Sequence, residues 1–426
     1  MSRGLYSLAW WLALPLVLVR LWWRGRKEPG YRRFIGERFG FQGNIRPPAG
    51  PVIWVHAVSV GETRAAEPLV DALLAAYPDH SVLMTHMTAT GRETGQALFS
   101  KYGHRFRQAF LPYDLGPFLA RFLKAYSPRI CILMETEVWP NLIAQCRRHH
   151  VPVVLLNARL SEKSAAKAKK FAGLMLEAAS GIALAAAQTD ADAQRLKQVG
   201  VQRVEVTGSI KFDVVPPNEK IALGLQWREQ FGKRPVLLCA STREGEELLI
   251  LDALQGKNLG STLLLIVPRH PQRFDEIAQM IRVRGLVMAR RSAFSDSMPL
   301  GEDVQVVLGD SMGEMFAYYA ACDLAYIGGS LLPLGGQNLI EACALGKPVL
   351  VGPHTFNFAL ATEEAINAGA AIRVGDADGM LQEALRLIGD DEERRARSAK
   401  ASAYAQQHRG ATSRTLVLLK EMLERA

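Results

Sequence analysis

Several motifs that define common enzyme classes are missing from this sequence. It contains no G-x-G-x-x-G dinucleotide loop, no Walker A phosphate loop and no H-E-x-x-H zinc motif. No C-x-x-C pair and no histidine–cysteine cluster is available for zinc. The two D-x-D sequences, at 190–192 and 376–378, stand where helices are expected to begin, so their carboxylates are better explained as helix caps. We therefore expect a protein that works without a metal or another cofactor.

Cysteine is scarce, and its placement is informative. The five cysteines are scattered along the chain and odd in number, and three of them lie inside apolar runs. This pattern favours reduced thiols buried in the core of a cytosolic body. They are Cys131, Cys146, Cys239, Cys322 and Cys343.

Positive charge, by contrast, is in excess. A net charge of +9 suits nucleic acid, an anionic membrane or a phosphorylated substrate. Basic residues crowd one short region beside an apolar segment, which favours a membrane surface and argues against nucleic acid. They are Arg20, Arg24, Arg26, Lys27, Arg32, Arg33 and Arg38.

The apolar segment itself, residues 5–19, is followed by more aromatic residues but by no small-residue cleavage site. Its paired tryptophans suit membrane interfaces, and the basic residues on its C-terminal side predict a cytoplasmic body. A membrane-spanning helix, a monotopic helix in the interface and a buried core helix all remain open. The segment at 31–41 alternates cationic and aromatic residues, which favours the headgroup level or a solvated helix face.

From residue 52 onwards, short apolar runs alternate with amphipathic segments, which predicts an α/β fold with open parallel sheets. Strands are expected at 52–59, 81–86, 106–111, 130–135, 152–157, 181–188 and 203–209, and again at 235–240, 262–267, 286–289, 304–308, 324–327, 348–351 and 371–374. Helices are expected at 64–76, 117–125, 141–148 and 164–179. The predicted organisation is an anchor at 1–30, Rossmann-like domains at 31–215 and 216–405 that face each other across a cleft, and a helix at 406–426 that packs back on the first domain.

The clearest ligand-binding pattern lies at 328–353, which reads GGSLLPLGGQNLIEACALGKPVLVGP. It predicts a strand, a glycine-rich loop, a helix carrying Glu341 and a second strand. Such a loop can leave N–H groups uncovered at a helix N-terminus, where a phosphate is favoured. A plain strand–helix turn, in which glycine only relieves backbone strain, is the alternative.

Charged residues follow other strands of the predicted sheets. Glu62 stands at a helix N-terminus, where it suits a general base or a purely stabilising carboxylate. Glu135 and Glu137 are close enough to repel, so at least one of them needs a cationic partner or a raised pKa. Lys211 could be that partner, or could stabilise an anionic leaving group. Arg269 and His270, between two prolines, suit phosphate or base recognition or form a rigid surface turn.

Taken together, the segments of the chain resemble the 3-deoxy-D-manno-octulosonic acid (Kdo) transferases of lipopolysaccharide biosynthesis. The segments that carry the resemblance are WWRGRKEPGYRRFIGERFGF, SVGET, LPYDL, METEVWPN, NARLS, TGSIKFD, STREGEE, VPRHPQRF, GDSMGEM, IGGSLLPLGGQN and GPHTFNF. The family consists of membrane-anchored, inverting glycosyltransferases with the two-domain GT-B fold. The resemblance implies that Kdo passes from CMP-Kdo to the lipid A precursor lipid IVA at the cytoplasmic face of the cell inner membrane.

The resemblance also implies roles for individual residues. Glu62 would be the proton acceptor, while Glu135 and Lys211 would stabilise the transition state. The domain at 31–215 would hold the acceptor and the domain at 216–405 the donor. The CMP moiety would bind at Pro268, Arg269, Met312, Gly313, Glu314, Asn338, Leu339, Ile340 and Glu341. The family often has histidine where this chain has Arg243 and Gln337, which leaves the details of donor contacts open.

Two other functions remain as alternatives. One is a membrane-associated GT-B transferase that uses a UDP-sugar, which competition between CMP and UDP would distinguish. The other is a membrane-anchored scaffold that binds nucleotide without chemistry, against which the paired carboxylates at strand ends argue. The number of Kdo residues transferred cannot be inferred from these motifs.

Overall fold

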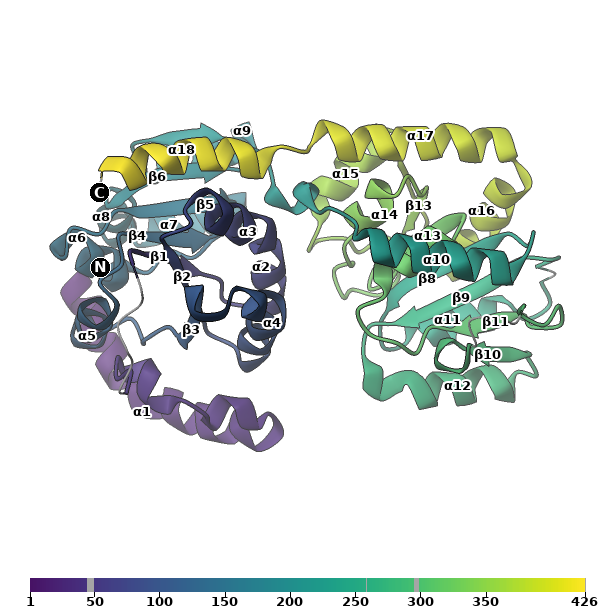
Figure 1. The fold of residues 1–426 in the computed structure, drawn as a ribbon, viewed down its shortest axis with the longest axis horizontal. Coiled ribbons are helices and arrows are strands. Elements are labelled where there is room, and N and C mark those ends of the chain that lie inside the picture. The colour runs from purple at the N-terminus through teal and green to yellow at the C-terminus, as the bar shows by residue number, and fades with distance from the viewer. Residues whose placement is uncertain (44–49, 258, 295–298, 426) are drawn as a thin grey trace. The chain divides into compact units, whose positions relative to one another are not determined.

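The computed structural model describes residues 1–43, 50–257, 259–294 and 299–425. The chain divides into two compact units. The first contains Met1–Asp213 together with Arg409–Ala426, and the second contains Val214–His408. Each unit is built on a sheet of seven strands flanked by helices, so the prediction of two α/β domains is confirmed (Figure 1).

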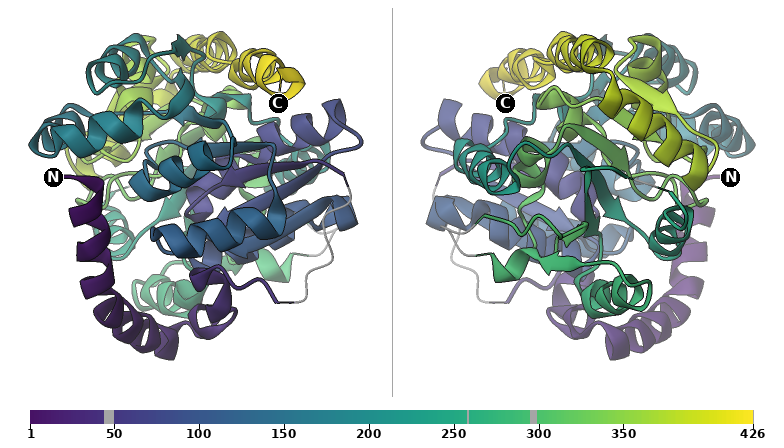
Figure 2. Two further views of the ribbon diagram at one scale, coloured as in Figure 1. Left: turned by 90° about the vertical axis from the view of Figure 1, so that its left-hand side faces the viewer. Right: turned by 90° about the vertical axis from the view of Figure 1, so that its right-hand side faces the viewer.

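The sheet of the first unit is parallel and has the order β3-β2-β1-β4-β5-β6-β7. Its strands are β1 (Val52–His56), β2 (Ser81–His86), β3 (Phe106–Phe110), β4 (Ile130–Met134), β5 (Val153–Ala158), β6 (Ile182–Ala187) and β7 (Val204–Val206). Helices cover both faces, as expected for strands that are apolar on both sides (Figure 2). The order reverses between β1 and β4, and sheets of this kind bind ligands at the carboxyl ends of strands beside such a switch point.

The helices of the first unit differ from the prediction in two places. They are α1 (Arg3–Lys27), α2 (Val60–Ala65), α3 (Glu67–Ala76), α4 (Ala89–Phe99), α5 (Gly116–Tyr126), α6 (Pro140–Arg148), α7 (Glu162–Lys170), α8 (Ala172–Ala179), α9 (Asp190–Gln198) and α18 (Ala411–Arg425). The helices expected at 64–76 and 164–179 are each divided in two. Pro68 in the first turn of α3 favours a new helix start there, and Phe171 leaves helical geometry with φ −118° and ψ 35°.

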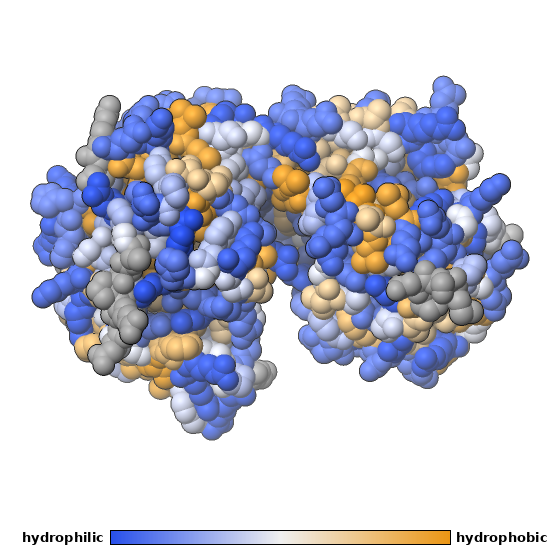
Figure 3. Space-filling model, in the orientation of Figure 1, coloured by the Kyte–Doolittle hydropathy of each residue, from blue (hydrophilic) through white to orange (hydrophobic). Residues whose placement is uncertain are grey.

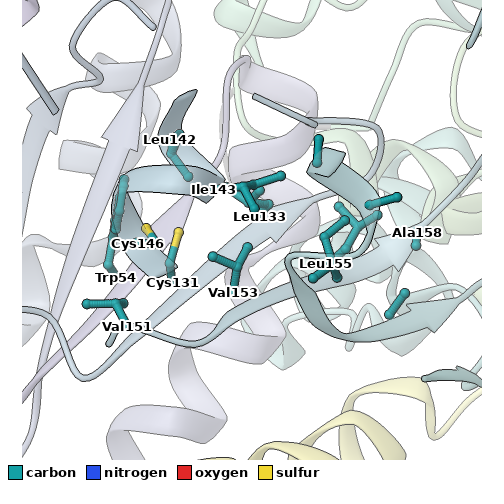
Figure 4. Close-up of a cluster of buried hydrophobic side chains, with 14 of the residues drawn as sticks. Trp54, Cys131, Leu133, Leu142, Ile143, Cys146, Val151, Val153, Leu155 and Ala158 are labelled. Carbon is teal, nitrogen blue, oxygen red and sulfur yellow. The ribbon is translucent and has the colours of Figure 1, made fainter. Parts of the chain in front are cut away.

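The core of the first unit lies in apolar layers on the two faces of its sheet. In one layer, Trp54 and Leu133 of the sheet pack with Leu142 of α6 (Figure 4). The sulfur atoms of Cys131 and Cys146 lie side by side in the same layer (Figure 4). All five cysteines are free and buried, which confirms the prediction of core thiols.

The second unit has a parallel sheet of order β10-β11-β9-β8-β12-β13-β14. The strands are β8 (Val236–Thr242), β9 (Leu263–Pro268), β10 (Met288–Arg290), β11 (Val306–Leu308), β12 (Leu324–Ile327), β13 (Val349–Val351) and β14 (Ala371–Arg373). The helices are α10 (Asn218–Phe231), α11 (Glu246–Ala253), α12 (Phe274–Val283), α13 (Met315–Ala321), α14 (Ile340–Ala344), α15 (Ala359–Asn367), α16 (Ala377–Gly389) and α17 (Asp391–Gln407). Its switch point lies between β8 and β12, the counterparts of β1 and β4.

The C-terminal helix belongs to the first unit. Ala411, Leu419 and Leu423 of α18 are buried in the apolar layer on the second face of the first sheet. The turn η4 (Ile210–Asp213) closes the first part of this unit. Its Asp213 carboxylate accepts hydrogen bonds from Gly410 N–H, at 2.6 Å, and from Thr412 N–H. One side chain therefore ties the two points at which the chain passes from one unit to the other.

Helix α1 is long and apolar enough to cross a membrane, with a mean hydropathy of 1.6 over its most apolar window and 6% of that window buried. Leu14 packs against Tyr113, Leu115 and Phe118 of the first unit. Its exposed apolar side chains are Leu5, Leu8, Trp11, Leu12, Leu16, Val19, Trp22 and Trp23. Figure 3 shows hydrophobic residues at the lower edge of the first unit, along the course of α1. The helix is thus not a buried core helix and could serve as an anchor.

The basic and aromatic segment after α1 is packed into the first unit. Arg38 is 2% exposed, lies 3.9 Å from the ring centroid of Phe110 and donates to Met87 O at 3.3 Å. Glu37 forms an ion pair with Arg92 and accepts from Phe110 N–H at 2.7 Å. The expectation of a headgroup-level segment is therefore wrong for these two residues, because Arg38 is buried in the domain and Glu37 is paired with Arg92 within it.

Candidate active site

Glu62 lies in the first turn of α2, immediately after the carboxyl end of β1. Ser59 is the N-cap of this helix, and its hydroxyl accepts from Glu62 N–H at 3.5 Å. The Glu62 carboxylate accepts from Val58 N–H at 2.8 Å and from the Ser59 hydroxyl at 3.1 Å. This reciprocal arrangement resembles a capping box, so the stabilising role expected for such a carboxylate is present. The same contacts hold the carboxylate in one place, as a base requires.

The end of β2 supports this turn from the side. His86 is fully buried, and its Nδ1–H donates to Ala57 O at 3.0 Å. The N–H groups of Met87 and Thr88 donate to Val58 O at 3.2 and 3.3 Å. Burial lowers the pKa of His86 to about 4, so the ring is neutral at physiological pH. The loop that carries Glu62 is therefore held through its own carbonyl groups.

Glu62 has an acidity unlike that of a surface carboxylate. Burial raises its pKa from 4.5 to about 7, and the nearby Glu137 and Glu135 carboxylates add to the rise. The hydrogen bonds from Val58 and Ser59 oppose it. A carboxylate with a pKa near the working pH can take up a proton from a substrate hydroxyl and release it again.

The two carboxylates after β4 are accommodated in different ways. Glu135 pairs with Lys211, with 2.7 Å between Oε1 and Nζ. Glu137 accepts from Trp139 Nε1–H at 2.8 Å, while burial, with a smaller effect from Glu135, raises its pKa. Both of the expected solutions to carboxylate repulsion are thus present, a cationic partner for one group and a raised pKa for the other. The structure brings Glu62, Glu135 and Lys211 into one electrostatic cluster.

The backbone around Lys211 and Glu135 is strongly constrained. Glu135 and Asn157 both adopt positive φ, at 58° and 52°, which is unusual outside glycine. The buried Asn157 side chain accepts from Ile210 N–H at 3.2 Å, one residue before Lys211. Backbone strain of this kind persists only where its surroundings fix it, and it is frequent at functional sites.

In the second unit, all the residues expected to contact CMP follow the carboxyl ends of strands of one parallel sheet. Pro268 ends β9, the Met312-Gly313-Glu314 segment follows β11, and Asn338 lies in the connection after β12. Because these strands are parallel, the three segments lie at one edge of the sheet, where ligands bind in this fold.

The glycine-rich loop differs from the expectation in one respect. The N–H groups of Gly329, Ser330 and Leu331 are not left uncovered for a phosphate. All three donate to the carboxylate of Glu246, with 2.9 Å from Ser330 and 3.0 Å from Leu331. The prediction of open N–H groups is therefore wrong for this part of the loop, because a buried side chain of the protein already supplies the anion.

Further along the loop, the expected nucleotide residues fall into two kinds. Leu339 and Ile340 are each 1% exposed, so their side chains belong to the core and only backbone atoms could face a ligand. Asn338 donates to Glu341 Oε1 at 3.2 Å and accepts from Ile340 N–H at 3.0 Å. The Asn338 and Glu341 side chains are half-buried polar groups at the start of α14, as predicted.

Glu314 and its neighbours form the third segment. Its carboxylate pairs with Arg291 at 3.2 Å and accepts a hydrogen bond from the Ser311 hydroxyl. Met312 is 56% exposed, and Gly313 has φ 75° with no atom within 4 Å of a Cβ built on it. This segment is an open, polar turn.

Both positions where the chain departs from the family pattern adjoin Gly329. A Cβ at Gly329 would lie 3.2 Å from Gln337 Nε2 and 3.4 Å from Arg243 Cγ. The two departures are thus neighbours in space, although they are far apart in sequence.

Sequence reasoning missed the roles of Glu246 and Glu247, which are both fully buried. Glu247 forms a two-pronged ion pair with Arg273, with 2.9 Å from Nη1 to each carboxylate oxygen. The available signal was a pair of carboxylates directly after a buried strand and a glycine, a position where burial without a partner is costly.

No group of three or more His, Cys, Asp or Glu side chains able to hold a metal ion occurs within the part of the chain that the structure describes. The residues of the candidate site are carboxylates, a lysine and backbone or amide groups.

The fold and these strand-end residues define a class, the two-domain α/β proteins of GT-B type. A glycosyltransferase from Rickettsia africae has a TM-score of 0.59 and 13% identity and covers 88% of this chain and 100% of its own length. HepE from Anabaena in complex with UDP has a TM-score of 0.56 and 16% identity and covers 87% of this chain and 99% of its own. At such low identity these likenesses concern the fold.

Sequence relatives identify the family. The model of the 3-deoxy-D-manno-octulosonic-acid transferase (kdotransferase) family matches residues 33–214. The 3-deoxy-D-manno-octulosonic acid transferase of Bordetella pertussis is 47% identical, over 99% of this chain and 100% of its own length. That of Haemophilus influenzae is 37% identical, over 100% of both chains. This chain belongs to the Kdo transferase family and is a glycosyltransferase of lipopolysaccharide biosynthesis.

Proposed function

We propose that the protein transfers Kdo from CMP-Kdo to lipid IVA, with inversion at the anomeric carbon. The observation that carries the proposal is the Glu62 carboxylate, fixed beside the Glu135–Lys211 ion pair with its pKa raised to about 7. A family member that forms a glycosidic bond requires a base for the acceptor hydroxyl, and Glu62 has the placement and acidity of one.

In the proposed reaction, the acceptor hydroxyl oxygen attacks C2 of Kdo and its proton passes to Glu62. The bond between C2 and the phosphate oxygen breaks, and its electron pair leaves with CMP. The sugar gains positive character as this bond lengthens, which nearby carboxylates such as Glu135 stabilise. Lys211 is assigned to the negative charge that develops on the leaving phosphate.

The CMP moiety is assigned to the second unit. Arg269 offers a guanidinium group, and Asn338 and Glu341 offer hydrogen-bonding side chains for ribose or base. Pro268, Leu339 and Ile340 would contribute backbone atoms, and the open turn Met312-Gly313-Glu314 would line the nucleotide.

We assign the membrane surface as the place of reaction, because the acceptor is a lipid. The exposed apolar side of α1 and the basic residues that follow it suit an anionic bilayer. The anchor is expected in the cell inner membrane with the catalytic units on its cytoplasmic side, and the reaction is expected to need no metal.

The test is transfer by the purified full chain, with the products identified by mass spectrometry. CMP-Kdo and lipid IVA should give Kdo-lipid and CMP in the presence of a metal chelator. A folded protein that forms no product would contradict the proposal. Inhibition by UDP but not by CMP would favour the UDP-sugar alternative, and the mass of the lipid product would give the number of Kdo residues added.

A further inference from the structure

The turn after β8 connects two of the segments assigned to CMP. Its last two residues, Glu246 and Glu247, open helix α11, and both are 0% exposed. A buried carboxylate is costly unless several hydrogen bonds or an ion pair compensate it. The partners of these two groups therefore show what the turn holds.

The Glu246 carboxylate accepts hydrogen bonds from three parts of the second unit. Tyr326 OH donates to Oε1 at 2.7 Å, and Arg243 N–H donates to Oε2 at 2.9 Å. The remaining donors are the N–H groups of Gly329, Ser330 and Leu331. The loop that follows β12 is thus wrapped around one carboxylate, which fixes its backbone.

The loop held by Glu246 is continuous with the nucleotide residues. Gly336 N–H donates to Gly329 O at 2.7 Å, and Gln337 N–H donates to Gly328 O at 3.0 Å. Asn338 follows directly. Displacing Gly329 would therefore displace the start of α14, where Asn338 and Glu341 lie.

Glu247 holds the other segment. Its partner Arg273 lies in the short turn η5 (Pro271–Arg273), and Arg273 N–H donates to His270 O at 3.1 Å. Arg269 N–H in turn donates to Thr242 O at 2.9 Å. The Arg269–His270 turn is thus attached to the same strand end through a backbone bond and through the Glu247–Arg273 pair.

We infer that Glu246 and Glu247 are positioning residues of the donor site, each holding in place one of two neighbouring segments that bind CMP. The inference rests on the proposed function, which it deepens by naming the groups that shape the nucleotide site before the nucleotide arrives. The third segment, around Glu314, is held by Arg291 and Ser311 and lies outside this arrangement.

The two substitutions Glu246→Gln and Glu247→Gln test the inference in the full chain. Glutamine keeps the shape of glutamate but has one acceptor oxygen and an NH₂ group. At least one of the N–H groups that donate to Glu246 therefore loses its acceptor. Asp252→Asn is the matched control, because Asp252 lies on the same helix and forms an exposed pair with Arg284.

The first measurement is hydrogen–deuterium exchange without ligand. We expect Glu246→Gln to accelerate exchange at Gly329, Ser330 and Leu331, and Glu247→Gln to accelerate it at Arg269 and Arg273. Asp252→Asn should change neither segment, and no variant should change the segment at Glu314. Wild-type exchange in a folded Glu246→Gln or Glu247→Gln protein would overturn the inference.

The second measurement is CMP affinity by calorimetry, together with steady-state kinetics. Loss of a charge-assisted hydrogen-bond network is expected to raise the CMP dissociation constant and the donor KM about tenfold or more, with the acceptor KM unchanged. A purely structural role would lower the amount of folded enzyme without moving donor KM. Unchanged CMP affinity in both folded variants would therefore contradict the inference.

If Glu246→Gln does not fold, Tyr326→Phe removes a single donor and leaves the charge in place. It should change exchange and CMP affinity in the same direction, by a smaller factor, and wild-type values would overturn the role of Glu246. Failure of the unchanged protein to bind CMP would instead contradict the proposed function, while the exchange experiment would still decide whether the two glutamates hold these segments.

Discussion

The two units place a glutamate at equivalent points, and the two glutamates have different surroundings. Glu62 follows β1 and Glu246 follows β8, the strands that flank the switch points of their sheets. Each accepts a hydrogen bond from a backbone N–H of its own turn, from Val58 and Arg243 respectively. Among the described residues, Glu62 has one further donor, the Ser59 hydroxyl, whereas Glu246 has four.

The number of hydrogen-bond donors around each carboxylate distinguishes Glu62 from Glu246. A fully satisfied carboxylate has no capacity left for a substrate, so Glu246 organises backbone. Glu62 is partly buried, has few donors and lies near two other carboxylates, so its proton affinity is raised instead. The same residue type at the same point of the fold therefore holds backbone in one unit and is the proposed base in the other.

The largest expected effect comes from removing the proposed base, Glu62. Glu62→Gln should lower the transfer rate about 10³-fold, since general-base catalysis contributes 10²–10⁴-fold. CMP affinity should not change, because the nucleotide is assigned to the other unit. Single-turnover transfer and CMP calorimetry measure the two quantities. Glu93→Gln, at an exposed position on α4, is the control, and near-normal transfer by Glu62→Gln would remove the base assignment.

Removing the cation beside Glu135 should have the next largest effect. Lys211→Met should lower kcat about 10²-fold, because a preorganised charge at a developing anion is worth 10²–10³-fold. Combining it with Glu135→Gln should cost less than the product of the single effects, since the two groups act as a pair. Lys101→Met removes an exposed partner of Asp71 and should leave kcat unchanged. Independent, multiplicative effects would argue against a functional pair.

The pH dependence of the transfer rate is a further way to compare Glu62 with Glu246. As the base must be ionised, kcat/KM should rise with pH up to about 7 and fall about tenfold per unit below it. The folded pKa of Glu62 lies above its ordinary value of 4.5, so the folded state binds this proton more tightly. Its contribution to stability therefore falls between pH 4.5 and about 7, while activity rises.

Glu137→Gln should move the acidic limb of that profile to lower pH, because it removes a charge that raises the pKa of Glu62. The pH profile of Glu246→Gln should keep its midpoint, as Glu246 lies in the other unit. A midpoint that is the same in wild type and Glu137→Gln would show that another group titrates.

The smallest effect concerns the cap. Ser59→Ala should lower the free energy of unfolding by about 1 kcal/mol, the usual worth of an N-cap. It should also raise the midpoint of the pH profile, because the Ser59 hydroxyl bond lowers the pKa of Glu62. Denaturant unfolding measures the first change. Ser161→Ala removes the N-cap of α7 and should cost similar stability without moving the midpoint.

Much of the architecture could be predicted from local patterns. Each expected strand is present, because apolar runs bounded by polar turns mark buried parallel strands well. The breaks at Ala66 and Phe171 were missed, since only one residue separates the two helices in each case. The packing of Arg38 was missed because its partners, Phe110 and Met87, are distant in sequence.

The candidate site was predictable to a different degree in each unit. A pair between Lys211 and one of the two carboxylates after β4 was among the possibilities, because parallel strand ends converge, and the structure shows Glu135 as the partner. The sequence could not predict which anion the glycine-rich loop binds. A loop that binds a phosphate and a loop that binds the carboxylate of Glu246 can have the same glycines. Only the structure shows that the turn after β8 places the Glu246 carboxylate inside this loop.

The hydrogen bonds of Asp213 with Gly410 and Thr412 have a consequence for synthesis on the ribosome. The first unit is complete only when Gly410, Thr412 and the buried face of α18 have been made. Translation of the intervening second unit, Val214–His408, takes roughly 10 to 40 s at 5–20 residues per second. During that interval the surface that α18 will cover, and the turn that carries Lys211, lack their final partners. The second unit is therefore completely synthesised before the first, although most of the first is encoded earlier, and the unit that carries the proposed base is the last to be finished.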